Sequence, residues 1–386
     1  MPRNVLTVTG RRTPLLLNIE KKVCPPSERP RLAVDAMGSD AGPAEVVAGV
    51  AKALANGLCA DVSFFGDGDM VGQIVNGHAQ LASATVVHAD SVVQMTDKPM
   101  HVLRRGRDTS MWAAVTAVSQ GAADAVLSGG NTGALMAVAR RQIGMIKGVE
   151  RPAITALWPS PKGRVVVLDV GANVDASDRQ LVSFAIMGEA FFRALTGKLK
   201  PSVGLLNVGA EELKGHETVR SAAALLRRAD AEMAFQGFVE GNDISEGVVD
   251  VVVTDGFTGN VALKSAEGAA RLVGGWMKEA LTGSLISKLS AALMGRELKS
   301  LRQKIDPSSV NGGVFLGING IVVKSHGGAN ASGVASAASM AAALTGRGFR
   351  RDVADNVGRV FATLDAASTG QDANTDQQSS GIKAVV

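Results

Sequence analysis

The residues that could do chemistry begin with a glycine-rich turn, Ser-Gly-Gly-Asn-Thr-Gly, at residues 128–133. Residues 125–127 predict the end of a short buried strand, and residues 134–140 predict a helix. Such a turn could hold an anion, because glycines let the backbone approach closely and the first helical N–H groups point outward. Asn131 and Thr132 could touch the anion as well, although both are common capping residues. Taken alone, the turn fits an ordinary helix cap equally well, and it matches neither the dinucleotide fingerprint nor the P-loop.

Turns that carry Asp or Asn beside Gly follow the predicted strands at several further places. They lie at residues 35–40, 169–175, 207–212, 241–243 and 255–260. One such turn is usually structural, but this many are better explained by a shared cleft. Binding residues of parallel sheets collect at the carboxyl ends of the strands, so the pattern predicts one site built from many strand ends.

The elements that must position these turns alternate between strands and helices. Strands are predicted at residues 32–37, 62–65, 85–88, 125–127, 153–157, 164–170, 203–208, 233–239, 249–254 and 320–324. Helices are predicted at residues 44–56, 109–120, 133–146, 179–195, 217–229 and 259–280, and a small-residue helix is predicted after Asn330. Continuous Val, Leu and Ile strands between helices indicate an α/β fold whose mostly parallel sheet is covered by helices on both faces.

The composition narrows the class of protein. The chain has 386 residues, 46% of them hydrophobic and 20% charged, with a net charge of +4. Tyr is absent and aromatic residues are 4%, so base-stacking surfaces and nucleic-acid binding are not expected. No apolar run reaches the roughly 18 residues of a membrane span, and the first residues lack the pattern of a signal peptide. The two cysteines, Cys24 and Cys59, have neither metal-ligand nor disulfide spacing, which fits a cytoplasmic protein.

Residues 276–305 have a pattern of their own. Leucine or methionine recurs every four residues from Met277 to Leu293, Met294 and Gly295 predict a corner, and basic residues outnumber acidic ones. The segment therefore predicts a protruding helical hairpin with an apolar, partly basic surface. Spacing alone slightly favours packing within the protein or a dimer, and contact with an anionic membrane stays open as the alternative.

Several motifs in a fixed order resemble the PlsX family, the acyl-ACP:phosphate acyltransferases of bacterial phospholipid synthesis. The motifs are LAVDAMGSDAGP (32–43), DKPMHVLRRGRDTSM (97–111), LSGGNTGALM (127–136), RPAI (151–154), LDVGANVD (168–175), LLNVGAEELKG (205–215), FVEGNDI (238–244), DVVVTDGFTGNVALKSAEG (250–268) and SHG (325–327). No single motif is decisive, but their order and spacing together are highly specific.

The resemblance implies transfer of a fatty acyl chain from acyl carrier protein to inorganic phosphate. The acyl phosphate product would then acylate glycerol 3-phosphate. The resemblance also implies a homodimer without metal or cofactor, and a fold akin to phosphotransacetylases and isopropylmalate-type dehydrogenases. It further implies a cytoplasmic protein in peripheral contact with anionic membrane and with the glycerol-3-phosphate acyltransferase PlsY.

The resemblance also suggests a division of the chain. Residues 1–30 are predicted to be a flexible extension, residues 31–366 the phosphate acyltransferase catalytic domain, and residues 367–386 a disordered tail. Within the domain, Gly106 stands where the family usually has Lys, and Asn242 where Arg is common. Ala176, Ala210 and His216 also replace frequent family residues. These departures question single contacts and leave the family resemblance intact.

The turn pattern and the resemblance together suggest site residues. Phosphate is predicted to bind Ser128, Gly129, Gly130, Asn131, Thr132 and Gly133. The candidate catalytic residues are Asn260, Lys264, His326, Asn207 and Asp255. Further substrate contacts are predicted from Asp35, Gly38, Arg104, Asp169, Asn173 and Lys214.

The predicted chemistry is direct attack of phosphate on a thioester. Asn173, Asn207 or Asn260 could donate to the oxyanion. Lys264 lies one helical turn after Asn260 and could assist the leaving thiolate, with His326 and Lys214 as rivals. Each of the three could equally be structural, and the strand-end aspartates could cap turns rather than transfer protons.

The sequence leaves other mechanisms and functions open as alternatives. A covalent acyl-enzyme is disfavoured because neither cysteine lies in a motif and no G-x-S-x-G elbow is present. A phosphotransacetylase-like enzyme that uses acyl-CoA is the first alternative, and only the family resemblance argues against it. A non-catalytic scaffold for carrier protein and membrane is the second, and the repeated strand-end turns argue against it.

Overall fold

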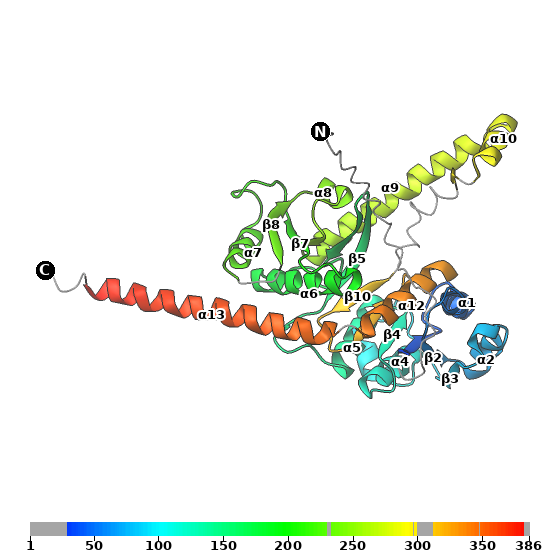
Figure 1. The fold of residues 1–386 in the computed structure, drawn as a ribbon. Helices are drawn as coiled ribbons and strands as arrows, with labels where there is room; N and C mark the ends of the chain where they lie inside the picture. Colours follow the sequence, from blue (N-terminus) through cyan, green and yellow to red (C-terminus); the bar gives the residue numbers. More distant parts are fainter. Residues whose placement is uncertain (1–28, 230–232, 296, 299–311, 347, 382–386) are drawn as a thin grey trace, which may run out of the picture.

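The computed structural model describes residues 29–229, 233–295, 297–298, 312–346 and 348–381 of the chain (Figure 1). One eleven-stranded sheet runs through the protein in the order β3-β2-β1-β4-β11-β10-β5-β6-β9-β7-β8. The strands are β1 (Arg31–Asp35), β2 (Asp61–Gly66), β3 (Thr85–His88), β4 (Ala125–Ser128), β5 (Ala153–Ser160), β6 (Gly163–Leu168), β7 (Ser202–Leu206), β8 (Ala234–Val239), β9 (Val251–Val253), β10 (Gly313–Leu316) and β11 (Ile321–Lys324).

Helices account for most of the remaining described chain. They are α1 (Gly42–Ala55), α2 (Gly68–Asn76), α3 (Pro99–Arg105), α4 (Ser110–Ser119), α5 (Thr132–Gln142), α6 (Asp178–Thr196), α7 (Glu217–Arg228), α8 (Gly241–Glu246), α9 (Gly256–Thr282), α10 (Leu285–Leu293), α12 (Ala331–Thr345) and α13 (Phe349–Gly381), with a 3-10 helix, η2, at Ala79–Leu81. None of the helices within the described ranges is long and apolar enough to cross a membrane.

The sheet has two parallel parts joined by antiparallel strands. Strands β1, β2, β3, β4 and β11 run parallel to one another, as do β6, β9, β7 and β8. Between these parts, β10 and β5 are antiparallel to each of their neighbours. The predicted α/β class with a mostly parallel sheet is therefore confirmed, with a mixed centre that was not expected. The short connection between β5 and β6 explains this centre, because a parallel pair needs a much longer crossover.

Helices cover both faces of the sheet. Alternate residues of β1 face opposite sides, with Leu32 and Val34 in one apolar core and Ala33 in the other. Helices α1, α6, α7, α12 and α13 bury apolar side chains in the first core, and α3, α4, α5 and α8 bury theirs in the second. The continuous apolar strands of the sequence thus reflect burial on both faces.

Most of the predicted elements are present, but the sequence did not predict three short helices or the long helix α13. The predicted helices correspond to α1, α4, α5, α6, α7, α9 and α12, and the predicted strands correspond to all but β10. Helices α2, α3 and α8 have only 9, 7 and 6 residues, too few for a clear helical period.

The predicted hairpin protrudes from the sheet, but its corner differs. Helix α9 leaves the body of the protein, and α10 packs against its far end (Figure 1). The chain bends first at Gly283 and Ser284, earlier than the predicted corner at Met294 and Gly295, although a turn is also present at Met294. The predicted continuation at residues 299–305 lies outside the described residues.

The sequence predicts a flexible extension at the start of the chain and a disordered tail at its end. The predicted flexible extension falls mostly on residues 1–28, which lie outside the described residues. Helix α13 buries Val353, Val357 and Val360 and continues to Gly381, whereas the sequence predicts disorder from residue 367. Residues 367–381 contain no proline that would interrupt the helix.

Candidate active site

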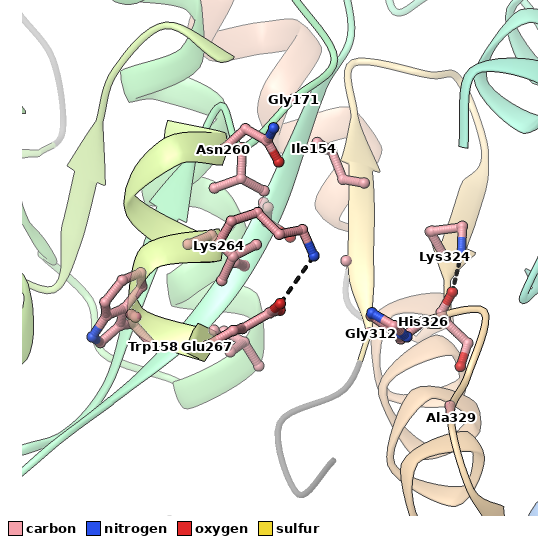
Figure 2. A pocket seen from close by; sticks show the side chains of 18 of the residues that line it. Ile154, Trp158, Gly171, Asn260, Lys264, Glu267, Gly312, Lys324, His326 and Ala329 are labelled. Atoms are coloured by element: carbon pink, nitrogen blue, oxygen red, sulfur yellow. Dashed lines mark hydrogen bonds and ion pairs between the residues drawn. The ribbon is translucent and has the colours of Figure 1, made fainter. Parts of the chain in front are cut away.

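A cavity of about 890 Å³ lies between α9 and the carboxyl end of β11 (Figure 2). One wall is formed by α9 together with β5, and the opposite wall by residues 324–326 and the start of α12. Figure 2 shows Asn260 and Lys264 reaching in from α9, with Lys324 and His326 on the other side. Of the residues predicted for the site, Thr132, Asn260, Lys264 and His326 line this cavity.

The position of α9 follows from two glycines at its start. Asp255 caps the helix by accepting hydrogen bonds from the N–H and the hydroxyl of Thr258, both at 2.8 Å. A Cβ on Gly256 would overlap the carbonyl oxygen of Asn173, and one on Gly259 would overlap that of Asp169. The Asp-Gly-x-Thr-Gly sequence therefore lets the helix dock directly on the loop after β6. This docking places Asn260 and Lys264 at the cavity, so Asp255 acts as a cap at the edge of the site.

Lys264 and Glu267 form an ion pair on the cavity face of α9. The Lys264 Nζ lies 2.9 Å from Glu267 Oε2, and the Lys264 side chain is 52% exposed. Water surrounds about half of the lysine, so the carboxylate only partly neutralises its charge. Lys264 also lies close enough to the other wall to lower the pKa of both Lys324 and His326.

Lys324 lines the cavity but is not among the site residues predicted from the sequence. Its side chain is buried, and Nζ donates a hydrogen bond to the carbonyl oxygen of Gly129 at 3.0 Å and another to that of Ser325. Burial lowers the pKa of Lys324 to about 8, against the opposing influence of Asp40 and Asp35. A lysine at the end of the apolar run Ile-Val-Val was the available signal, because lysine is almost never buried without partners.

His326 follows Lys324 on the same loop and faces the cavity. Its Nδ1 accepts a hydrogen bond from the N–H of Gly328 at 3.1 Å, so the ring proton of the neutral form lies on Nε2. Burial, assisted by the nearby Lys264, lowers the pKa of His326. The imidazole is therefore neutral near pH 7 and presents an N–H donor at Nε2.

The predicted phosphate turn at residues 128–133 uses most of its polar groups to hold itself in place. Ser128 Oγ donates to Asp35 Oδ2 at 2.6 Å and accepts from the N–H of Gly130 at 3.0 Å. Asn131 Oδ1 caps α5 through the N–H of Ala134, and its Nδ2 donates to three carbonyl oxygens in residues 94–97. Within the described chain, only Thr132 of this turn lines the cavity. Asn131 is therefore committed to the protein and is not placed as a phosphate donor.

Asp35 holds the turns that follow β1 and β4 through hydrogen bonds. It is fully buried and accepts hydrogen bonds from Ser110 Oγ at 2.7 Å, from Ser128 Oγ, and from the N–H of Gly38 at 3.2 Å. Burial raises the pKa of Asp35 although these donors oppose the shift. A Cβ on Gly38 would collide with the Asp35 carboxylate, so this glycine allows the turn to close. Asp35 and Gly38 thus support the site without lining the cavity in the described structure.

Asp169 and Asn173 play the same supporting part at the end of β6. The Asp169 carboxylate accepts hydrogen bonds from four backbone N–H groups and from Asn173 Nδ2. Asn173 Nδ2 also donates to the carbonyl oxygen of Pro152 at 2.8 Å. Burial raises the pKa of Asp169, and its donors oppose the shift. Both side chains hold the loop on which α9 docks, so neither is positioned as a direct substrate contact.

Three other predicted residues do not line this cavity. Asn207 Nδ2 donates to the carbonyl oxygen of Lys214 at 3.0 Å, and Lys214 Nζ pairs with Glu211 at 2.7 Å on the surface. Arg104 is exposed on α3. The structure therefore gathers only some of the strand-end turns at the cavity: residues that follow β4, β6, β9 and β11 line it, whereas Asn207 and Lys214, which follow β7, do not.

Apolar side chains line the rest of the cavity. They come from β5 and from the same face of α9 and include Ile154, Leu157, Trp158, Leu263, Ala266 and Ala270. Trp158 Nε1 donates to Ser245 Oγ at 3.2 Å, which ties β5 to α8 at this end. The lining therefore combines cationic groups with apolar side chains, as expected for a ligand with a charged group and an alkyl part.

Among the described residues, no group of three or more His, Cys, Asp or Glu side chains is placed to hold a metal ion.

Comparisons with known proteins show which sequences and structures this chain resembles. Residues 30–351 match the family model described as "Fatty acid synthesis protein". A phosphate acyltransferase of Maricaulis maris is 52% identical over 340 residues, covering 87% of this chain and 97% of the relative. A phosphate acyltransferase of Caulobacter vibrioides is 48% identical over 352 residues, covering 91% of this chain and 98% of the relative.

Solved structures of low sequence identity share the fold. A phosphotransacetylase from Streptococcus pyogenes has a TM-score of 0.56 at 16% identity, covering 82% of this chain and 94% of that one. A branched-chain phosphotransacylase from Enterococcus faecalis has a TM-score of 0.51 at 15% identity, covering 82% of this chain and 99% of that one. The family model and the close relatives show that this chain belongs to the PlsX family of phosphate acyltransferases.

Proposed function

We propose that the protein transfers a fatty acyl group from acyl carrier protein to inorganic phosphate, and that the acyl phosphate serves to acylate glycerol 3-phosphate. The observation that carries the proposal is the mixed lining of the cavity. Lys324, Lys264 and His326 line it together with apolar side chains of β5 and α9. Phosphate is small and anionic, whereas an acyl thioester is long and apolar, so the two kinds of lining residue suit the two substrates.

Phosphate is proposed to bind between the two lysines. Lys324 is held in one orientation by the carbonyl oxygens of Gly129 and Ser325. Lys264 reaches from the opposite wall, and Thr132 adds a hydroxyl at the first turn of α5. The first N–H groups of a helix favour an anion, so this end combines two cations with a helix start. The predicted phosphate site is thereby moved from the glycine-rich turn itself to the space in front of it.

Catalysis is proposed to rest on positioning and charge stabilisation. An oxygen of HPO₄²⁻ attacks the thioester carbon, and the carbonyl oxygen becomes an oxyanion. Asn260 lines the cavity from the docked end of α9, and its Nδ2 is the proposed donor to this oxyanion. Collapse of the tetrahedral intermediate forms the acyl–oxygen–phosphorus linkage and breaks the carbon–sulfur bond.

The proton balance gives His326 a role. The O–H proton of HPO₄²⁻ must end on the sulfur of the departing thiol. The Nε2–H of the neutral imidazole can donate a hydrogen bond to the departing thiolate, which takes up the phosphate O–H proton directly. The lowered pKa of His326 keeps the ring neutral. Lys324 and Lys264 stabilise the negative charge of phosphate throughout.

The decisive experiment is acyl phosphate formation by the purified protein from acyl-ACP and phosphate without added metal. We expect product with acyl-ACP and a much lower kcat/KM with acyl-CoA. A preference for acyl-CoA would favour the phosphotransacetylase-like alternative. Binding of carrier protein without product would favour the non-catalytic scaffold.

The family resemblance also leads us to propose a homodimer in peripheral contact with anionic membrane and with the glycerol-3-phosphate acyltransferase PlsY. The α9–α10 hairpin supports the membrane part of this proposal. Ile286, Leu293 and Met294 are 78%, 82% and 51% exposed near its tip, and Lys288 lies among them. Exposed apolar side chains beside a cation suit reversible contact with an anionic lipid surface.

A further inference from the structure

Residues 94–107, which we call the rim segment, have no part in the chemistry proposed above. The segment contains four cationic residues, Lys98, Arg104, Arg105 and Arg107. Its one acidic residue is Asp97, and Asp108 follows directly after it. All four cationic side chains are exposed. Within the described part of the chain, none of the four forms an ion pair, in contrast to Arg31, which pairs with Asp124 at 2.6 Å. Unpaired cations gathered on a short segment are a feature of surfaces that meet an acidic partner.

The rim segment is fixed beside the cavity on two sides. Asn131 Nδ2 donates to the carbonyl oxygens of Met95 at 2.8 Å and of Asp97 at 3.0 Å. The next residue, Thr132, lines the cavity. On the other side, a Cβ on Gly327 would lie 2.8 Å from the Met95 methyl group, and the next residue, Gly328, also lines the cavity. A molecule seated on the rim segment would therefore lie next to the cavity entrance.

Exposed apolar side chains accompany these cations. Met95 is 38% exposed and Met100 is 59% exposed. Methionine is flexible and is common on surfaces that accept a partner protein. Beneath them, Val102 is buried and α3 packs against α5, so the segment is a fixed platform.

We propose that the rim segment is the docking surface for an acidic protein, the acyl carrier of the proposed reaction. This inference rests on the proposed function, because it names the part of the surface that recognises the acyl donor. Carboxylates of the carrier would pair with Lys98, Arg105 and Arg107, and its apolar side chains would meet Met95 and Met100. The flexible arm of the carrier would then reach past Thr132 into the cavity.

The test compares two double charge reversals. The first is Lys98→Glu with Arg105→Glu on the rim segment. The matched control is Lys200→Glu with Arg228→Glu, two exposed cations on the α7 side of the molecule that also lack ion pairs among the described residues. We expect the rim variant to raise KM for acyl-ACP by about 10-fold or more, because rim charges steer association. Added salt should raise this KM for the wild type, where it screens attraction, and lower it for the rim variant, where it screens repulsion. The control variant should keep the wild-type KM.

An acyl-pantetheine thioester, which has no carrier protein, separates docking from chemistry. The rim variant should use it at the wild-type kcat/KM. An unchanged KM for acyl-ACP in a folded rim variant would overturn the proposal, as would equal losses with both donors. Loss of binding to anionic vesicles with an unchanged KM for acyl-ACP would make the segment a lipid contact and would also overturn it.

Failure of the proposed function would be visible separately. If the wild-type protein makes no acyl phosphate from acyl-ACP, the reaction is wrong whatever the rim variant does. Docking is then tested by titrating the wild-type protein and the rim variant with unacylated carrier protein. Weaker binding by the rim variant alone would support the docking surface, and equal binding by both would overturn it.

Discussion

The two walls of the cavity carry one lysine each, and the lysines are held in different ways. Lys264 projects from α9, is half exposed, and pairs with Glu267. Lys324 is buried at the end of β11 and is held by two carbonyl oxygens, one of them on the glycine-rich turn after β4. We call the side formed by α9 and β5 the helix wall and the side formed by residues 324–326 the strand wall. The charge of Lys264 on the helix wall can move, whereas the charge of Lys324 on the strand wall is held in one place.

This difference predicts unequal contributions to catalysis. A charge in water-filled surroundings is screened, whereas a desolvated and oriented charge interacts more strongly with an anion. Orientation in advance also avoids rearrangement when negative charge develops on the reacting groups. Lys324 should therefore contribute more to binding and turnover than Lys264.

The largest expected effect is that of Lys324→Met. Methionine fills a similar volume but removes the cation, and the loss of a preorganised charged donor typically costs about 10²-fold or more in rate. We expect kcat/KM for phosphate to fall by about that factor in an assay of acyl phosphate formation. Circular dichroism should show a folded protein, because the substitution also removes a buried charge. A folded variant with nearly wild-type kinetics would break the comparison.

Lys324→Arg is the matched control for charge, and its readout is the pH profile. Because the pKa of Lys324 is lowered to about 8, the lysine loses its proton as the pH rises through that value. The wild-type kcat/KM for phosphate should therefore fall between about pH 7 and 9, since kcat/KM reports groups of the free enzyme. Arginine keeps its charge throughout this range, so the alkaline fall should disappear in the variant. A fall that persists unchanged with arginine would assign it to another group.

A smaller effect is expected for Lys264→Met. The side chain is about half exposed and shares its charge with Glu267, so we expect kcat/KM for phosphate to fall by about 10-fold. Glu267→Gln sharpens the test, because it frees the ammonium group without removing it and should lower KM for phosphate slightly. If Lys264→Met lowers kcat/KM for phosphate as much as Lys324→Met does, the buried lysine contributes no more than the exposed one and the comparison fails.

The same contrast explains how far the site could be predicted from the sequence. The helix wall was predictable, because Asp255, Gly256 and Gly259 form a visible helix start and place Asn260 and Lys264 one turn apart. The strand wall was only half predicted, since His326 was named and Lys324 was not. A lysine at the end of an apolar strand is informative only once the strand is known to be buried.

The strand-end aspartates show that the sequence does not predict the direction in which a side chain points. Asp35 and Asp169 were expected to contact substrate, yet both are buried beneath their turns and accept hydrogen bonds from the protein. The sequence shows that such turns carry Asp, Asn and Gly, but it does not show which direction a carboxylate faces. Asn131 and Asn173 bind carbonyl groups that are distant in the chain, and local sequence does not show these contacts.

The fold itself was more accessible than the site. Long elements such as α6 and the parallel strands follow directly from periodicity and burial. The antiparallel centre and the strand order depend on pairings between distant segments, such as β10 with β5. Local pattern does not contain that information.

The smallest effect on turnover is expected far along the helix wall, where α9 leaves the cavity and meets α10. We predict that Ile286→Glu with Leu293→Glu leaves acyl-ACP turnover in solution nearly unchanged and reduces co-sedimentation with anionic liposomes. Each exposed apolar side chain could contribute on the order of 1 kcal/mol to lipid contact, and glutamate adds repulsion from the anionic surface.

The matched control for the hairpin is Leu199→Glu with Met70→Glu, because both side chains are exposed elsewhere, Leu199 at 86% and Met70 at 47%. This control should bind liposomes like the wild type. If the hairpin variant loses its dimer instead, as measured by light scattering, Ile286 and Leu293 are interface residues and the packing interpretation of the hairpin holds. If a folded hairpin variant binds liposomes normally, the hairpin has no membrane role. If its turnover falls as far as that of Lys264→Met, the far end of α9 is coupled to the cavity, and the helix wall is more rigid than the exposure of Lys264 implies.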